Sequence, residues 1–129
     1  MKKNGFTLVE VLAVIVILGV ILAIVVTNVR SVIQRSTEKG MESHAYMVLD
    51  LLKTYSLTED NFDITDFNID NLAAFELNVD NYDAISATIV NGKIRIYIKG
   101  KGKLDGFIAC GIRSDITVVP ETDLVTCTP

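Results

Sequence analysis

The N-terminal part of the chain is dominated by one apolar run. From Phe6 to Val29 the only charged residue is Glu10, and residues 11–26 read VLAVIVILGVILAIVV. At 1.5 Å per residue, a helix of this length crosses or nearly crosses a hydrocarbon core of roughly 30 Å. Lipid offers the backbone no hydrogen-bond partners, whereas a helix pairs its backbone N–H and C=O groups internally. We therefore predict a membrane-spanning helix here, with Gly19 as its one weak helix former.

A second pattern begins where the first one ends. From Val29 onward the apolar residues recur at intervals of three, four and seven, which places them on one stripe of a helix. Gly40 costs about 1 kcal/mol relative to Ala but does not stop a helix. We predict one continuous helix from about Phe6 to about Tyr55, whose second half packs one face on a small head domain. The stripe consists of Val29, Val32, Ile33, Met41, Ala45, Val48, Leu49, Leu52 and Tyr55.

The downstream half carries a β-hairpin signal. Residues 84–90 and 93–98 are β-rich runs joined by Asn91-Gly92, the pair that suits a type I′ turn because both central residues need positive φ. The two-residue turn sets the register, and with it one apolar face. Further strands are predicted at 107–112, 116–119 and 124–127. The fold class is therefore α+β, with a long N-terminal helix packed on a small antiparallel β-sheet. The apolar pairs are Ile85 with Ile98, Ala87 with Ile96, and Ile89 with Ile94, and the opposite, polar face pairs Thr88 with Arg95 and Ser86 with Tyr97.

The segment from Ser56 to Asp83 is polar and acidic. It holds eight of the 16 acids and no Lys or Arg, yet apolar residues recur in it often enough to attach it to a core. We interpret it as an ordered connection, with a short capped helical turn at 70–75. The spacing Asp66-x-Asn68-x-Asp70 copies the first half of a calcium loop, but Leu77 stands where that loop needs its Glu. A solvated acidic face is the favoured interpretation.

Composition narrows the function classes. The 129 residues include 12 Lys+Arg, 16 Asp+Glu and one His, for a formal net charge of −4. This size predicts one domain, or one domain with an appendage. An acidic chain argues against nucleic acid as a partner, because phosphate neutralisation needs clustered cations. The five basic residues within 93–103 are expected to pair with the acidic connection, either within one subunit or between adjacent subunits. Nucleic acid binding by these residues is a minor alternative.

Neither an enzyme nor a metal centre is predicted. His44 is interpreted as a surface or partly buried residue, since no Ser, Cys or second His lies at a useful spacing. One His and two Cys are too few for a His/Cys metal cluster. The glycines near 100–103, interpreted as a mobile basic loop, match no phosphate-binding pattern. No cofactor is expected.

Two details distinguish the N-terminus from that of a plain membrane anchor. Glu10 lies inside an otherwise apolar run, where a charge has a real cost even near the end of a helix. The short leader Met1–Gly5 ends in Gly just before Phe6. A cut after Gly5 would create an α-amine on Phe6 with a pKa of about 8, which could pair with Glu10 within one helix or between neighbouring helices.

These residues carry a resemblance to a known family. Residues 5–12, GFTLVEVL, after a short basic leader and before a long apolar run, resemble the class III signal of type IV pilins and pseudopilins. The resemblance covers about the first 30 residues. It implies that a membrane peptidase cuts between Gly5 and Phe6 and N-methylates Phe6. It also implies that Glu10 pairs with a neighbouring subunit's amine during filament assembly.

One departure concerns the helix. Many members of this family carry a Pro in the second half of the apolar segment, whereas residues 23–28 read AIVVTN. Any local melting on assembly would therefore start at Gly19.

The resemblance also implies an organisation and a set of partners. The leader would be 1–5, the transmembrane or filament-core helix 6–28, and the pilin head 29–129. The expected partners are other pilin subunits, the prepilin peptidase and methyltransferase, an inner-membrane assembly platform, and the membrane before assembly. The expected locations are the cell membrane for a single-pass precursor and the cell surface for the filament.

The function implied is that of a structural subunit of a type IV pilus, with adhesion and twitching motility among the end uses. The alternatives are a pseudopilin of a type II secretion or competence system and, less favoured, an uncut membrane-tethered binding domain. The N-terminal residues serve pilus and pseudopilus subunits alike.

Cys110 and Cys127 are the two cysteines of the sequence. Outside the membrane an even number favours a disulfide, and many pilins cross-link their C-terminal region in this way, so the resemblance supports the pairing. Such a bond would close a loop of about 15–18 residues, which the chain-entropy model values at roughly 3 kcal/mol. Two reduced thiols are the alternative.

Overall fold

The computed structural model describes Gly5 and residues 7–129, which divide into two compact units. The boundary lies between Arg35 and Ser36, within the helix α1, Leu8–Thr58. The predicted continuous helix is confirmed, and its end lies three residues beyond the expected Tyr55.

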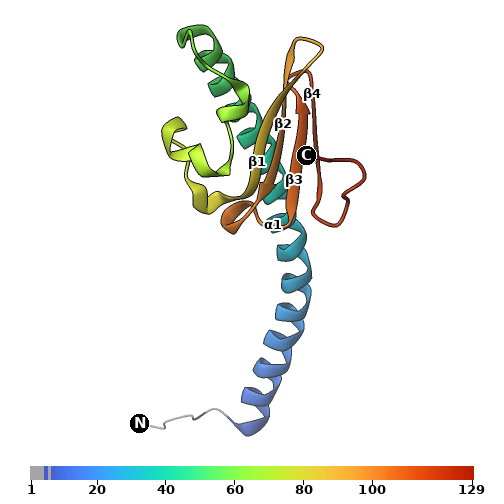
Figure 1. Ribbon diagram of the computed structural model, residues 1–129. Helices are drawn as coiled ribbons and strands as arrows, with labels where there is room; N and C mark the ends of the chain where they lie inside the picture. The colour runs from blue at the N-terminus through green and yellow to red at the C-terminus, as the bar shows by residue number, and fades with distance from the viewer. Residues whose placement is uncertain (1–4, 6) are drawn as a thin grey trace. The chain divides into compact units, whose positions relative to one another are not determined.

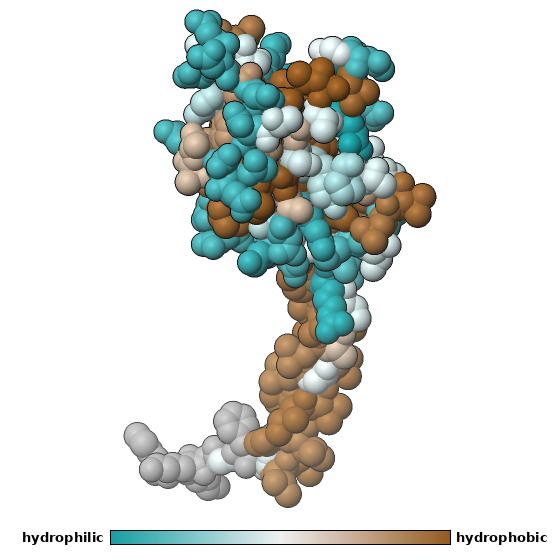
Figure 2. Space-filling model, viewed as in Figure 1, coloured by the Kyte–Doolittle hydropathy of each residue, from teal (hydrophilic) through white to brown (hydrophobic). Residues whose placement is uncertain are grey.

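The first unit consists mainly of the beginning of α1. Its side chains from Leu8 to Val26 are apolar apart from Glu10, and Figure 2 shows this stretch almost uniformly hydrophobic. Among the described residues, one helix is long and apolar enough to cross a membrane, and this stretch supplies its apolar character. Val29, Val32 and Ile33 of the predicted stripe are exposed, at 46%, 63% and 58%. The buried part of the stripe begins only at Met41.

The second unit is a sheet covered by the last part of α1 (Figure 1). Four strands pair antiparallel in the order β1-β2-β3-β4, which confirms the α+β class. Residues of α1 spaced three and four apart lie on one face of the helix. They pack against alternate residues of the strands, which lie on one face of the sheet. The bounds are Tyr82–Val90 for β1, Lys93–Gly100 for β2, Phe107–Ile112 for β3 and Asp115–Pro120 for β4. The helix contributes Met41, Ala45, Val48, Leu49 and Leu52 to the core.

The predicted hairpin register is confirmed pair by pair from Val90–Lys93 to Ile85–Ile98. Asn91 and Gly92 both have positive φ, at 52° and 76°, as a type I′ turn requires. The apolar face is buried along most of its length but opens near the turn, where Ile89 is 61% exposed.

The acidic connection is ordered, as predicted. It forms three short 3₁₀ turns, η1 Ile64–Asp66, η2 Ile69–Phe75 and η3 Val79–Asn81. The cap of η2 is Asn68 rather than Asp70, because the Asn68 side chain accepts a hydrogen bond from the Asp70 amide. Three apolar side chains of the segment, Phe67, Leu72 and Phe75, are buried in the core.

The loop after β2 differs from its prediction as a mobile basic segment. It contains a further 3₁₀ turn, η4 Gly102–Leu104, whose Leu104 is buried. Gly100 approaches this turn so closely that a Cβ there would overlap the Leu104 carbonyl. The packing of Leu104 against the core therefore fixes the loop.

The outer face of the sheet, away from α1, carries a second small core. Tyr97, predicted to lie on a polar face, is buried there with Ile108, Cys110, Val119 and Cys127. The segment after β4 supplies this cover. The strand predicted at 124–127 was wrong, because these residues form a turn.

Candidate processing and assembly site

The start of α1 is built by two residues that cap each other. The Thr7 amide donates to Glu10 Oε2 at 3.2 Å, and the Glu10 amide donates to Thr7 Oγ1 at 3.3 Å. This is a capping box, in which two helix-end amides that lack intrahelical partners are satisfied reciprocally. The acid in the first turn also faces the positive end of the helix dipole. The cap therefore fixes the point where the helix begins.

Gly5 precedes this cap and is exposed. A Cβ added to it would meet no heavy atom within 4 Å, so the described structure leaves open space around this residue. Phe6, the predicted partner of Gly5 in cleavage and the predicted N-methylation site, lies outside the described residues. Its amine, the predicted partner of Glu10, lies outside them as well.

Glu10 has one carboxylate oxygen engaged by the cap. Among the described residues, Oε1 is left without a hydrogen bond. The carboxylate can therefore hold its own helix start through Oε2 while Oε1 remains available to a cation. Between Val11 and Val26 the helix carries no other charge, so Glu10 is the local anion of this segment.

Gly19, the predicted weak point, lies in regular helix. A Cβ at this position would also meet nothing within 4 Å. The helix therefore gains no contact from this glycine and keeps the extra backbone freedom that glycine confers.

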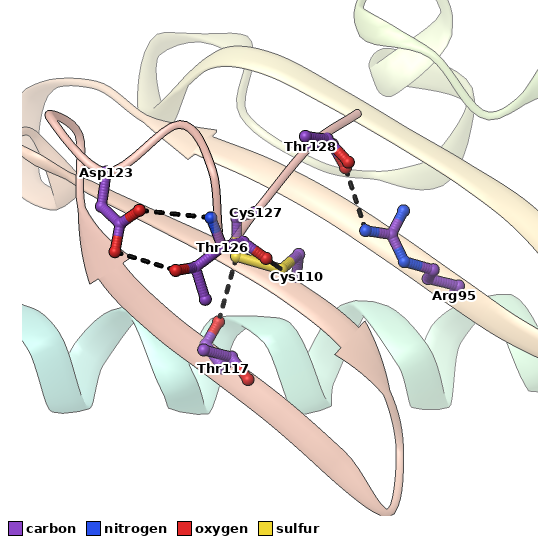
Figure 3. Close-up of a disulfide and its surroundings, with 7 residues drawn as sticks. All are labelled: Arg95, Cys110, Thr117, Asp123, Thr126, Cys127 and Thr128. Carbon is purple, nitrogen blue, oxygen red and sulfur yellow. Dashed lines mark hydrogen bonds between the residues drawn. A yellow bond between two sulfur atoms is a disulfide. The ribbon is translucent and has the colours of Figure 1, made fainter.

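Cys110 and Cys127 form a disulfide, with a Cα–Cα distance of 5.7 Å (Figure 3). Cys110 belongs to β3, and Cys127 comes from the segment that follows β4. The Arg95 guanidinium reaches the same segment and donates to the Thr128 carbonyl at 2.9 Å. These two links hold the C-terminal segment on the outer face of the sheet.

The turn between β4 and the disulfide is held by Asp123. Its carboxylate accepts from the Thr126 amide at 3.2 Å and from the Thr126 hydroxyl at 2.9 Å. These hydrogen bonds to the charged form lower the pKa of Asp123 below its ordinary value. A local Asx-type turn thus replaces the strand expected from 124–127.

Two other residues singled out in the sequence have structural environments. His44 is partly buried, with its ring centroid 5.8 Å from that of Tyr82, and burial lowers its pKa. Asn68, the centre of the calcium-like triplet, uses its side chain to cap η2. Within the described part of the chain, no group of three or more His, Cys, Asp or Glu side chains is arranged to hold a metal ion.

Within the described part of a single chain, the basic residues of β2 and the adjoining loop form no ion pair with the acidic connection, and pairing between subunits stays a prediction. Among the described residues, the ion pairs are Lys99 with Glu121, at 2.8 Å, and Arg113 with Asp50. Both acids lie outside Ser56–Asp83. Because these pairs are solvent-exposed, each is expected to contribute little to stability.

The capping role of Thr7 was not predicted from the sequence. The signal was present, since Thr7-Leu8-Val9-Glu10 has the T-x-x-E spacing of a capping box immediately before an apolar run. The adjoining apolar run favours an interpretation of Glu10 as a charge partner in lipid, which obscures its local role in the cap.

Comparison with known proteins bears on this site. Residues 1–26 match the family model of the prokaryotic N-terminal methylation motif. No curated protein and no solved structure matches the chain. The match includes Gly5, the Thr7–Glu10 cap and most of the apolar run. The chain therefore begins with the N-terminal methylation motif that is the class III signal peptide of type IV pilins.

Proposed function

We propose that this protein is a structural subunit of a type IV pilus, made as a membrane-anchored precursor and assembled through its N-terminal helix. The observation that carries the proposal is the methylation motif over residues 1–26, with an exposed Gly5 beside a capped helix start. The apolar helix beyond it fits a precursor held in the membrane.

The proposal assigns a role to each part of the chain. Residues 1–5 are the leader removed by a prepilin peptidase, and Phe6 is the new N-terminus that becomes methylated. Residues 6–28 span the membrane before assembly and enter the filament core afterwards. Residues 29–129 form the head, which includes the remainder of the helix.

Assembly places the Phe6 amine of one subunit against Glu10 of another. An ionised carboxylate in an apolar surrounding is costly without a partner, and an amine on a neighbouring helix supplies one. The carboxylate oxygen that the cap leaves open supports this role. Gly19 is the position where α1 loosens most readily if the helix melts locally during assembly.

A pseudopilin of a secretion or competence system is the second candidate, because the same N-terminal residues serve both kinds of subunit. The two candidates differ in the fibre that results. Sheared long surface fibres containing this chain would support the pilus subunit, and short fibres confined to the envelope would support the pseudopilin.

The experiment that tests the proposal is the intact mass and N-terminal sequence of the protein from its native host, together with electron microscopy of sheared surface material. We expect a chain that starts at methylated Phe6 and is present in fibres. A chain that still starts at Met1, and is absent from any fibre, would replace the subunit with a membrane-tethered domain.

A further inference from the structure

The head carries an apolar groove at one end of the sheet. The groove has a volume of about 840 Å³ and lies between the end of α1, the β1–β2 turn and the β3–β4 turn. Its apolar lining includes Leu57 and Ile89, which are 77% and 61% exposed, and the half-buried Ile94. It continues the face of β1 that buries Ile85 and Ala87, so it is the part of the apolar inner face that α1 leaves uncovered.

The rim of the groove is basic. Lys53 and Lys93 line it, and neither forms an ion pair within the described residues. Arg113 also lines it and is paired with Asp50. The groove therefore presents apolar surface beside two available ammonium groups, which suits an apolar ligand next to an acid.

A surface of that chemistry exists elsewhere on the same head. In the turn after β4, Leu124 is 61% exposed and Val125 is 91% exposed, the most exposed large apolar side chain of the described residues. Asp123 adjoins them directly and supplies a carboxylate, whose pKa the hydrogen bonds from Thr126 lower further below its ordinary value. Figure 2 shows apolar patches of this kind on the otherwise polar head.

The projecting turn is held in a fixed shape before any contact is made. Asp123 holds one side of it through Thr126, and the disulfide at Cys127 holds the other. A rigid projection loses little conformational entropy on binding, so even a small apolar contact can contribute to association.

The turn and the groove lie on opposite faces of the sheet. The groove opens on the face that α1 covers, where Ile94 and Ile96 belong to the main core. The C-terminal segment covers the other face, through Cys110 and Tyr97. The turn therefore meets a groove only on a second copy. Because the two surfaces differ, the contact is heterologous and repeats from copy to copy instead of closing a dimer.

We propose that the Leu124–Val125 turn of one copy docks into the Leu57–Ile89 groove of a neighbouring copy, with Asp123 facing Lys93. This inference rests on the proposed filament function and names a head-to-head contact within it. Two side chains bury less than a stable dimer interface requires. The contact therefore sets the position of heads already brought together by their helices.

The test uses the full-length chain in the host, with a photo-cross-linking amino acid in place of Leu124. Cross-linked peptides from sheared fibres are identified by mass spectrometry. We expect links between copies to the groove segments at 53–57, 89–94 and 112–114. The same probe in place of Val79, which is 46% exposed on η3, is the matched control and should not label the groove.

Charge variants probe the geometry. Val125→Lys places a cation against the basic rim and should abolish the groove cross-link, and adding Lys93→Glu should restore it. Both side chains are exposed, so neither change disturbs the core; the disulfide, measured by intact mass, verifies the fold.

The outcomes separate the two proposals. Mature fibres in which the probe labels another surface, or in which Val125→Lys leaves the link intact, would overturn the docking contact and leave the filament function standing. An uncut chain without fibres would overturn the filament function and the contact together.

Discussion

Thr7 and Glu10 each donate a backbone amide to the other's side chain, at 3.2 and 3.3 Å. The acid proposed to join neighbouring subunits is therefore also the acid that starts its own helix. Removing Glu10 eliminates both roles at once. The two roles separate when the charge is removed and the hydrogen-bond acceptor is kept.

Glu10→Gln and Glu10→Ala make that separation. Gln at this position keeps the capping box but carries no charge, whereas Ala keeps neither. If the neighbour's amine needs the charge, both variants are cut after Gly5 but assemble poorly, as measured by intact mass and by the yield of sheared fibres. Normal fibres from Glu10→Gln would show that Glu10 acts as a cap and not as an ion-pair partner.

Thr7→Val is the complementary variant. It keeps the shape of the side chain but removes the hydroxyl acceptor, a loss worth about 1 kcal/mol of helix stability at an N-cap. We expect near-normal fibre yield and increased hydrogen exchange at the Glu10 amide in detergent. A fibre defect as large as that of Glu10→Ala would indicate that assembly depends on helix initiation and not on the charge of Glu10.

Gly5→Val tests processing. The space around Gly5 is open, so a side chain there does not clash with the described structure, and a block must arise in the peptidase. The expected product is a membrane-bound precursor that retains the mass of residues 1–5. Gly19→Ala is the control, since its surroundings are equally open; it should be cut normally and gain about 1 kcal/mol of helix stability. An unchanged mature mass for Gly5→Val would refute cleavage at this position.

The disulfide should account for much of the stability of the head. Cys110 and Cys127 are 17 residues apart, and closing a loop of that size is worth roughly 3 kcal/mol in the chain-entropy model. For a unit of this size, the double variant Cys110→Ser/Cys127→Ser should lower Tm by roughly 12–24 °C, followed by circular dichroism of the full chain in detergent. Reduced wild-type protein should show the same drop. A Tm unchanged in both samples would contradict a stabilising role for the bond.

His44 should make the head less stable in mild acid. Burial lowers its pKa in the folded protein below the ordinary value of 6.5, so the unfolded chain binds the proton more tightly. The free energy of unfolding should therefore fall as pH drops below about 6.5 and be unaffected by His44 above it. Tyr82 and Lys103 lie beside His44 and add no negative charge at these pH values.

The measurement is denaturant unfolding of the full chain in detergent from about pH 8 to about pH 5, with His44→Gln as the comparison. The difference between the two proteins isolates His44 from the carboxylates that titrate at lower pH. Parallel pH profiles for wild type and His44→Gln would contradict the assignment.

The sequence predicted best what local rules determine. The Asn91-Gly92 turn set the β1–β2 register from Val90–Lys93 to Ile85–Ile98, and helical spacing predicted which residues from Met41 to Leu52 are buried. Tyr97 was assigned to a polar face because alternation along a strand does not say whether a distant segment covers that face. Residues 124–127 were predicted to form a strand because they include β-branched residues. The hydrogen bonds between Asp123 and Thr126, which form a turn instead, do not show in that pattern.

The candidate site was predicted in the same uneven way. Gly5 and Glu10 were singled out because a leader boundary and a lone acid contrast with an apolar run, and their roles stay predictions. Thr7 was not, because a capping residue stands out only when the start of the helix is known. The groove between Leu57 and Ile89 depends on how far α1 extends over the sheet, and no periodicity in the sequence encodes that.

The cover on the outer face of the sheet has a consequence for the order of biogenesis. Cys127 follows all four strands along the chain, and its partner Cys110 lies in the third. The apolar N-terminal segment leaves the ribosome first and is available to the membrane before any strand exists. The cross-link closes last, when the segment after β4 reaches β3. Oxidation of this pair therefore requires that all four strands have already been synthesised.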